Sequence, residues 1–403
     1  MKPKLPIVFI VMTVVIDAMG IGLIIPVMPQ LLLEVLPTAT LGQAAIWGGV
    51  MAMLFSLMQF LFGPMLGSLS DQYGRKPLLL VTLVMMTIGY LIMALAGGIW
   101  LLLFGRIIGG ISSATQSTAT AYIADISKPE EKAGNFGLIS AGFGIGFVLG
   151  PLLGGALVEF GTRAPFYAAG LLALANALFG AVVLRESLTA SNRRAFEWRR
   201  ANPLGAFRYI GQFKDLIPLL WVSFCFYISV AVYPAIWVYY TTERFGWSPG
   251  LIGVSLAVYG GSTVLVQAVL IRLANRYLGD NKTVKLGLII QIPTLTMIAL
   301  VGDGTLLLAL TPLAALGSIG TPALQAIMSR AVGTESQGAL LGVLASLNAF
   351  ATMIALIGMT QIFAYFSRGD ALLYLPGAPF LLSALLMALG LGLFWRLRLS
   401  AQA

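Results

Sequence analysis

Long apolar runs separated by short polar segments extend along the whole chain. A helix needs roughly 20 apolar residues to cross a hydrocarbon core of about 30 Å. Twelve runs reach this length, so the pattern predicts twelve transmembrane helices. The predicted spans are 6–32, 44–67, 77–97, 99–122, 134–159, 165–185, 215–241, 249–272, 284–302, 305–328, 337–366 and 371–396. The first run exceeds the apolar core of a signal peptide and has no small-residue cleavage site, so we expect a retained helix.

The composition supports a membrane protein and argues against an enzyme. Of the 403 residues, 59% are hydrophobic and 10% are charged, whereas a soluble domain has about 25% charged residues. The chain has no His and a single Cys225, which excludes a Ser-His-Asp triad, His-containing zinc sites and an intramolecular disulfide. An intramembrane enzyme would need paired acids, an activated nucleophile or a metal cluster. We therefore expect a protein that is not an enzyme and uses no cofactor.

The basic residues lie mainly on one side of the predicted membrane. With both termini placed in the cytoplasm, only Arg163, Arg244 and Arg368 of the 24 Lys and Arg residues fall on the opposite side. Arg106 falls inside a span, and all the others are cytoplasmic. The positive-inside rule supports this orientation and the even number of spans. It also explains the net charge of +9 without a nucleic-acid partner.

A polar stretch near the centre of the chain divides the predicted spans into two groups of six. The expected domains are six-helix bundles at 1–188 and 215–403, joined by a cytoplasmic linker at 189–214. The basic and aromatic residues of the linker suit either a solvated connection or an amphipathic helix on the membrane surface. The segment 272–282 reads as a degraded copy of 67–77, six spans later. Repeated halves are typical of secondary transporters, whose substrate site lies between them.

The loop between spans two and three contains an ordered motif, Gly67-x-x-x-Asp71-x-x-Gly74-Arg75-Lys76-Pro77. Gly74 can take a positive φ in a tight turn. Asp71 can accept hydrogen bonds at a helix end, and Arg75 can pair with a nearby carboxylate. Asp125, at the cytoplasmic end of span four, is a candidate partner for Arg75. We expect these residues to form a charged clasp that gates movement, although a simple basic turn is the alternative.

Asp17 is the only carboxylate that we place deep inside a span. A charge at the bilayer centre costs about 2.5–3.5 kcal/mol on insertion scales, so such residues are usually functional. At 1.5 Å per residue, Asp17 and Arg106 reach similar depths from opposite sides. A direct or water-bridged contact between them is therefore geometrically allowed. We expect Asp17 to load and release a proton and Arg106 to tune it; the alternative for Asp17 is an acid that caps helix breaks.

Span five carries small residues at four-residue spacing, at Gly142, Gly146, Gly150 and Gly154. This spacing places them on one helical face, where small residues let backbones approach closely. Pro151 should weaken or bend the helix. We expect the stripe to form a leak-tight sliding contact between the two halves, with ordinary helix packing as the alternative.

Three motifs resemble the signatures of one family. The Gly67–Pro77 loop, Arg106-Ile-Ile-Gly109-Gly110 in span four and Gly142–Gly155 in span five resemble motifs of the major facilitator superfamily, the last in its drug/proton antiporter branch. The segments 17–26, 243–247 and 322–325 are similar to tetracycline-efflux transporters. The resemblance implies an all-α fold of twelve transmembrane helices in two pseudo-symmetric bundles around a central cavity, acting as a monomer.

The resemblance also implies a function. It is proton-coupled efflux of an amphipathic small molecule, with tetracycline-like drugs first, across the bacterial inner membrane. The proton gradient is the driving force. Four residues are expected in the substrate cavity: Gln59, Trp237, Gln325 and Asn348.

The chain departs from its apparent relatives at several positions. Gly89 and Ala315 stand where we align intramembrane acids of tetracycline-efflux relatives, and Thr263 lies near a His of one such branch. Gln72 replaces the usual Arg of the loop motif. The missing acids weigh against a metal–tetracycline chelate as substrate. The alternatives are a sugar or metabolite symporter or uniporter of the same fold, against which Gly150-Pro151 argues, and a transport-inactive receptor.

Overall fold

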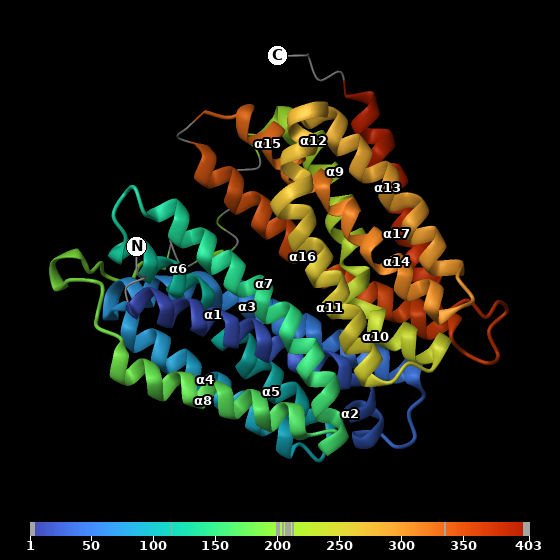
Figure 1. The fold of residues 1–403 in the computed structure, drawn as a ribbon, viewed down its shortest axis with the longest axis horizontal. Helices are drawn as coiled ribbons and strands as arrows, with labels where there is room; N and C mark the ends of the chain where they lie inside the picture. Colours follow the sequence, from blue (N-terminus) through green and yellow to red (C-terminus); the bar gives the residue numbers. More distant parts are fainter. Residues whose placement is uncertain are drawn as a thin grey trace. The chain divides into compact units, whose positions relative to one another are not determined.

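The computed structural model describes residues 5–113, 115–198, 202–203, 205, 211, 213–333 and 336–397. Within these residues the secondary structure is entirely helical (Figure 1). Among the described residues, twelve helical segments are long and apolar enough to cross a membrane, and each overlaps one of the twelve predicted spans. The predicted all-α, twelve-span fold is confirmed.

The first six spans include two that are broken. Span one is divided by a 3₁₀ turn, Ile25–Val27, because Pro26 and Pro29 cannot donate backbone hydrogen bonds. Span four bends after Ser112. The helices are α1 (Leu5–Ile24), α2 (Met28–Val35), α3 (Leu41–Tyr73), α4 (Arg75–Leu95), α5 (Ile99–Ser112), α6 (Thr115–Ile126), α7 (Lys132–Leu157) and α8 (Ala164–Val183).

Spans seven, eight and ten are also interrupted. Span eight contains a π-helix, Val266–Leu270, and π-turns in long helices often occur at functional sites. Span ten contains a 3₁₀ segment, Gly317–Ile319. The helices are α9 (Ile217–Val230), α10 (Val232–Phe245), α11 (Pro249–Leu265), α12 (Ile271–Leu278), α13 (Asp280–Leu300), α14 (Gly304–Leu316), α15 (Gly320–Arg330), α16 (Gln337–Phe366) and α17 (Ala378–Arg396).

The predicted start of the last span was wrong. The sequence predicted a helix from residue 371, but α17 begins at Ala378. Residues 371–377 are apolar but contain Pro376, which disfavours helical dihedrals at the residue before it. Leu372 and Leu373 are exposed in this segment. Apolar character alone therefore overstated the length of this span.

The chain divides into two compact units. The first contains 1–40, 50–203 and 247–257, and the second contains 41–49, 204–246 and 258–403. The start of α3 thus belongs to the second unit, and the start of α11 to the first. The predicted boundaries at 188 and 215 stay a prediction. Of the predicted linker, residues 193–198 are not helical, and 199–201, 204, 206–210 and 212 lie outside the described residues.

In the first unit, α1 packs against α6, α7 and α8. The N-terminal half of α1 contributes Phe9, Ile10 and Val14 to a core that includes Leu79 of α4 and Tyr122 of α6. Figure 1 shows α1 running beside α7 along most of its length. Because α1 is enclosed by its neighbours, the polar groups that it carries are buried.

Candidate functional site

Asp17 lies in α1 and is 7% exposed. Its Oδ1 atom is buried and accepts no hydrogen bond from the described part of the chain. Tyr90 of α4 lies within electrostatic range of both Asp17 and Arg106. The Tyr90 hydroxyl lies against α1 one turn beyond Asp17, where a Cβ on Gly20 would be 2.7 Å from its oxygen. Tyr90 therefore lies within electrostatic range of both predicted residues.

A small cavity of about 20 Å³ lies beside Arg106. Tyr90 and Arg106 supply polar groups to its wall, and the guanidinium carbon of Arg106 is 5.7 Å from the centre of the Phe55 ring. Gly89 also lines this cavity. The volume suits one water molecule, which needs at least about 10–15 Å³. Sequence reasoning missed Tyr90, although its position beside Gly89 in an apolar span was the available signal.

Arg75 lies at the centre of a charged cluster at the turn between α3 and α4. Its guanidinium pairs with Asp71 at 2.6 Å and with Asp125 at 3.2 Å, and it donates a short hydrogen bond to Ser70 Oγ. Gly74 has a φ of 109°, a conformation that L-residues rarely adopt. The geometry that the sequence predicted for Asp71, Gly74, Arg75 and Asp125 is present. Gly67 lies in the last turns of α3, and the gating role of all these residues stays a prediction.

Glu186 is a member of this cluster that sequence reasoning missed. Its Oε1 accepts a hydrogen bond from the backbone N–H of Arg75 at 2.8 Å, and its Oε2 accepts one from Lys76 N–H at 3.2 Å. Carboxylates are favourable at a helix N-terminus, because N–H groups there lack intrahelical acceptors. The side chain also leaves no space at Gly74, where a Cβ would be 2.3 Å from Oε2. Glu186 thus ties the end of the first six spans to the start of α4.

We expect Glu186→Ala to lower the melting temperature of the purified protein. The change leaves two helix-terminal N–H groups without their acceptors, and loss of a cap typically costs about 1 kcal/mol. Glu130→Ala is the matched control, since Glu130 is an exposed acid in the loop between α6 and α7. The measurement is thermal unfolding in detergent followed by tryptophan fluorescence. Equal shifts for the two variants would contradict the capping role.

The glycine stripe of α7 packs against α1, so the prediction of a contact between the two halves was wrong for this face. A Cβ on Gly146 would be 2.3 Å from the Val15 carbonyl oxygen, and one on Gly154 would be 2.1 Å from that of Leu23. Gly142 faces Val11, and Gly150 faces Met19 and Gly22 of α1. The spacing correctly indicated a close backbone approach, but spacing alone does not identify the neighbouring helix.

A second face of α7 packs on the start of α11, inside the same unit. A Cβ on Gly155 would be 2.5 Å from the Pro249 carbonyl oxygen. A Cβ on Gly253 would be 2.3 Å from the carbonyl oxygen of Pro151. Pro151 lies inside α7 without ending the helix. Gly155 and Pro151 therefore let α7 approach α11 closely, and the sliding role expected for the stripe stays a prediction.

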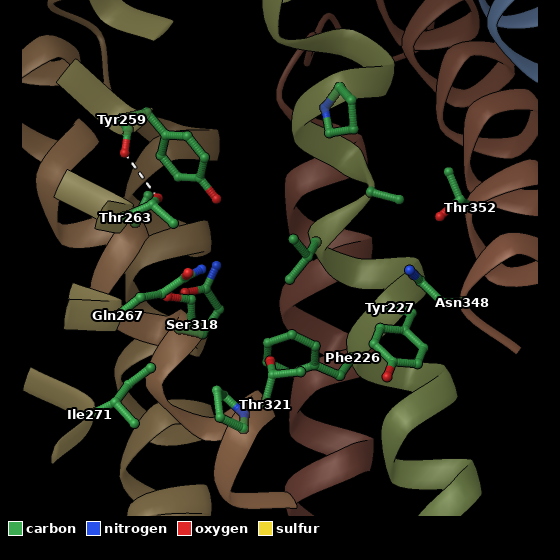
Figure 2. A pocket seen from close by; sticks show the side chains of 16 residues that line it. Phe226, Tyr227, Tyr259, Thr263, Gln267, Ile271, Ser318, Thr321, Asn348 and Thr352 are labelled. Atoms are coloured by element: carbon green, nitrogen blue, oxygen red, sulfur yellow. Dashed lines mark hydrogen bonds between the residues drawn. The ribbon is translucent and has the colours of Figure 1, made fainter. Parts of the chain in front are cut away.

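The second unit contains a cavity of about 650 Å³. Figure 2 shows Thr263 and Gln267 on one side of it and Asn348 and Thr352 on the other. Gln267 comes from the π-helix of span eight, and Thr263 donates a hydrogen bond to the Tyr259 carbonyl at 2.9 Å. The lining is Phe226, Tyr227, Val230, Ala231, Pro234, Tyr259, Thr263, Gln267, Ile271, Gln291, Ala314, Ser318, Thr321, Pro322, Asn348 and Thr352. None of these described residues is charged.

The four predicted cavity residues have different positions. Asn348 lines the cavity, and the Gln325 amide donates to the hydroxyl of the lining residue Tyr227 at 3.4 Å. Trp237 is 3% exposed and packs against Tyr233 and Phe380 with ring centres 6.0 and 6.2 Å apart, so the structure does not support its predicted cavity position. Gln59 is an exposed residue of α3 in the first unit. Sequence reasoning did not single out Gln291 or Gln267 from the other amides.

Twelve membrane-crossing helices, a buried acid and a large uncharged cavity define a polytopic membrane protein built to hold a small molecule. The family model described as Major Facilitator Superfamily matches residues 10–232 and 219–402. The chain belongs to this superfamily of transporters and is a multi-pass integral membrane protein. The resemblance predicted from its motifs is confirmed.

The curated relatives include several tetracycline resistance proteins. The chain is 38% identical to the tetracycline resistance protein, class C, of Escherichia coli over 96% of both chains. It is 36% identical to the class G protein of Vibrio anguillarum over 87% of this chain and 88% of the relative. Among solved structures, the nucleoside transporter NupG matches with a TM-score of 0.80 over 97% of this chain and 99% of that chain. At 11% identity, this last match shows the fold alone.

Proposed function

We propose that the protein exports an amphipathic small molecule, with tetracyclines as leading substrates, in exchange for protons. The observation that carries the coupling is the buried Asp17 carboxylate, which is within electrostatic range of Tyr90, as is Arg106. A buried carboxylate is costly when charged and cheap when protonated. Protonation of Asp17 therefore changes the relative free energies of conformations that hydrate this site differently.

The drug side of the proposal rests on the cavity and the relatives. A volume of about 650 Å³ is in the usual range for small-molecule sites, which are mostly apolar with a few polar groups. Rings of Phe226, Tyr227 and Tyr259 provide flat apolar contacts. The relatives with 36–38% identity carry tetracycline resistance in their names. A ring system with hydroxyl and amide groups fits this lining.

In the proposed cycle, access to the cavity alternates between the two sides of the bacterial inner membrane. Protons enter from outside, load Asp17 and favour the return of the empty transporter. Arg106 adjusts the affinity of Asp17 for the proton, and the Asp71–Arg75–Asp125 cluster gates the cytoplasmic side. The termini are cytoplasmic, the protein acts as a monomer, and the proton gradient replaces any cofactor.

Uptake into everted vesicles tests this function. We expect tetracycline to accumulate when the vesicle interior is acidified, and accumulation to collapse when a protonophore removes the gradient. A panel of amphipathic cations, sugars and nucleosides is measured in parallel. Gradient-driven uptake of a sugar or nucleoside instead of a drug would identify a metabolite transporter. No gradient-driven uptake of any compound would contradict the proposal and favour facilitated diffusion or a receptor role.

A further inference from the structure

Gln291 of α13 is a buried amide at the wall of the large cavity. It is 2% exposed and is one of the lining residues. Its Nε2 group donates a hydrogen bond to the Tyr233 hydroxyl at 3.3 Å. Tyr233 is held in turn by the ring of Tyr259, whose centre is 5.4 Å away. The Oε1 atom of Gln291 is buried and accepts no hydrogen bond from the described part of the chain. Nε2 of the amide therefore has a hydrogen-bond partner, whereas Oε1 has none in the described part of the chain.

Gly317 provides the space for this amide. It begins the 3₁₀ segment that interrupts span ten, Gly317–Ile319. A Cβ at this position would be 1.6 Å from Oε1 of Gln291 and 2.5 Å from its amide carbon. Its φ is −60°, which any residue can adopt, so the requirement for glycine here is steric. The fold keeps a polar side chain pressed against this break at the cavity wall.

An unsatisfied buried acceptor costs free energy, and in native structures such a group calls for an explanation. The position of Gln291 offers one, because a ligand in the cavity can supply the missing donor. The last torsion of a glutamine side chain is soft, so the amide can turn as a whole, with Nε2 and Oε1 moving together, and bring Oε1 to a donor without a change in the backbone. The remaining polar lining consists of hydroxyls and amides, with no carboxylate among the described lining residues.

Because none of the described lining residues is charged, the lining favours an uncharged ligand. A divalent cation prefers several oxygen ligands, usually with carboxylates among them. A chelate would also bring positive charge into a cavity whose lining has none to balance it, which is unfavourable. An uncharged or internally neutral ring system with hydroxyl or amide donors meets neither difficulty.

We propose that Gln291 determines substrate specificity by accepting a hydrogen bond from a hydroxyl or amide N–H of a neutral, metal-free aromatic ligand. The inference deepens the proposed function and rests on it. Gly317 acts as the positioning residue, since it lets the Gln291 amide occupy its place. Tyr233 holds the opposite side of that amide.

Binding of tetracycline to the purified protein tests the inference. Dissociation constants are measured from tetracycline fluorescence in detergent, with Mg²⁺ and with EDTA. For the wild type we expect the two values to agree within about twofold. Gln291→Met preserves length and apolar volume but removes the acceptor, and we expect binding to weaken about tenfold. Gly317→Ala displaces an unchanged Gln291 and should weaken binding similarly. Gln291→Glu supplies a carboxylate and should make binding dependent on Mg²⁺.

Gln361→Met is the control, because Gln361 is an exposed amide of α16 outside the cavity lining. Its dissociation constant should equal that of the wild type, and a thermal melt of each variant separates misfolding from lost recognition. Wild-type binding that requires Mg²⁺, or unchanged binding by folded Gln291→Met, would overturn the inference while the efflux function stands. If the wild type binds tetracycline under neither condition, both the inference and the proposed drug are wrong.

Discussion

We expect Asp17→Asn to abolish the proposed gradient-driven accumulation of the substrate while the protein remains folded. Asn has the same shape as Asp but binds no proton, so loading and release at this position stop. A buried carboxylate contributes little to stability, because removing it also removes the cost of burying charge. We expect uptake into everted vesicles to fall to the level of vesicles without the transporter. The thermal melting curve should match that of the wild type or lie above it.

Asp370→Asn is the matched control, since it makes the same chemical change at an exposed residue in a loop outside the spans. Its uptake should equal that of the wild type. Exchange of labelled substrate across vesicles without a pH gradient separates binding from coupling, and Asp17→Asn should retain it. Uphill accumulation by Asp17→Asn would show that another group carries the proton.

The membrane topology followed from the sequence because one strong physical term sets it. The bilayer requires each span to be long, apolar and internally hydrogen-bonded. Runs such as Leu41–Tyr73 meet that requirement whatever their neighbours are. The exception at residues 371–377 arose where Leu372 and Leu373 are apolar but Pro376 opposes a helix. Local backbone chemistry outweighed hydropathy there.

The contact partners of the site residues were harder to predict from the sequence. A sequence shows which residues share a helix face, but not which residues of another helix lie opposite them. The pair between Arg75 and Asp125 was predictable, since opposite charges at the same membrane side attract. Glu186 was not, because its place at the start of α4 depends on how α8 packs against α4. Tyr90 comes within electrostatic range of Asp17 and Arg106 only after three helices assemble.

At the cavity, prediction and structure differ at Trp237 and at Gln291, and both differences have the same origin. Trp237 and Gln291 are both buried residues that carry a polar group in an apolar span. Only the rotation of each helix about its own axis decides which of them faces the cavity. The weak helical patterning of these buried spans leaves that rotation unspecified in the sequence. Neighbours on other helices, such as Gly317, which leaves space for the Gln291 amide, can be identified only in the three-dimensional structure.

We expect a bulky residue at Gly146 to push α1 away from α7, to lower the stability of the protein and to abolish transport. In Gly146→Val the new Cβ would be 2.3 Å from the Val15 carbonyl oxygen and 2.8 Å from the Ala18 Cβ. Backbone atoms cannot rotate away as a flexible side chain can. Overpacking of this kind costs about 1–3 kcal/mol or more. We expect a lower melting temperature in detergent and uptake at the background level.

Gly137→Val makes the same change two to three turns earlier in α7, where nothing lies within 4 Å of the added Cβ. Both variants carry the same cost in helix propensity, so the difference between them isolates the helix contact. Equal melting temperatures would show that α1 and α7 tolerate separation. Because Val15, Ala18 and Met19 of this contact flank Asp17, a shift of α1 also moves the proton site. Partial loss of uptake with an altered pH dependence in milder Gly146→Ala would follow from that displacement.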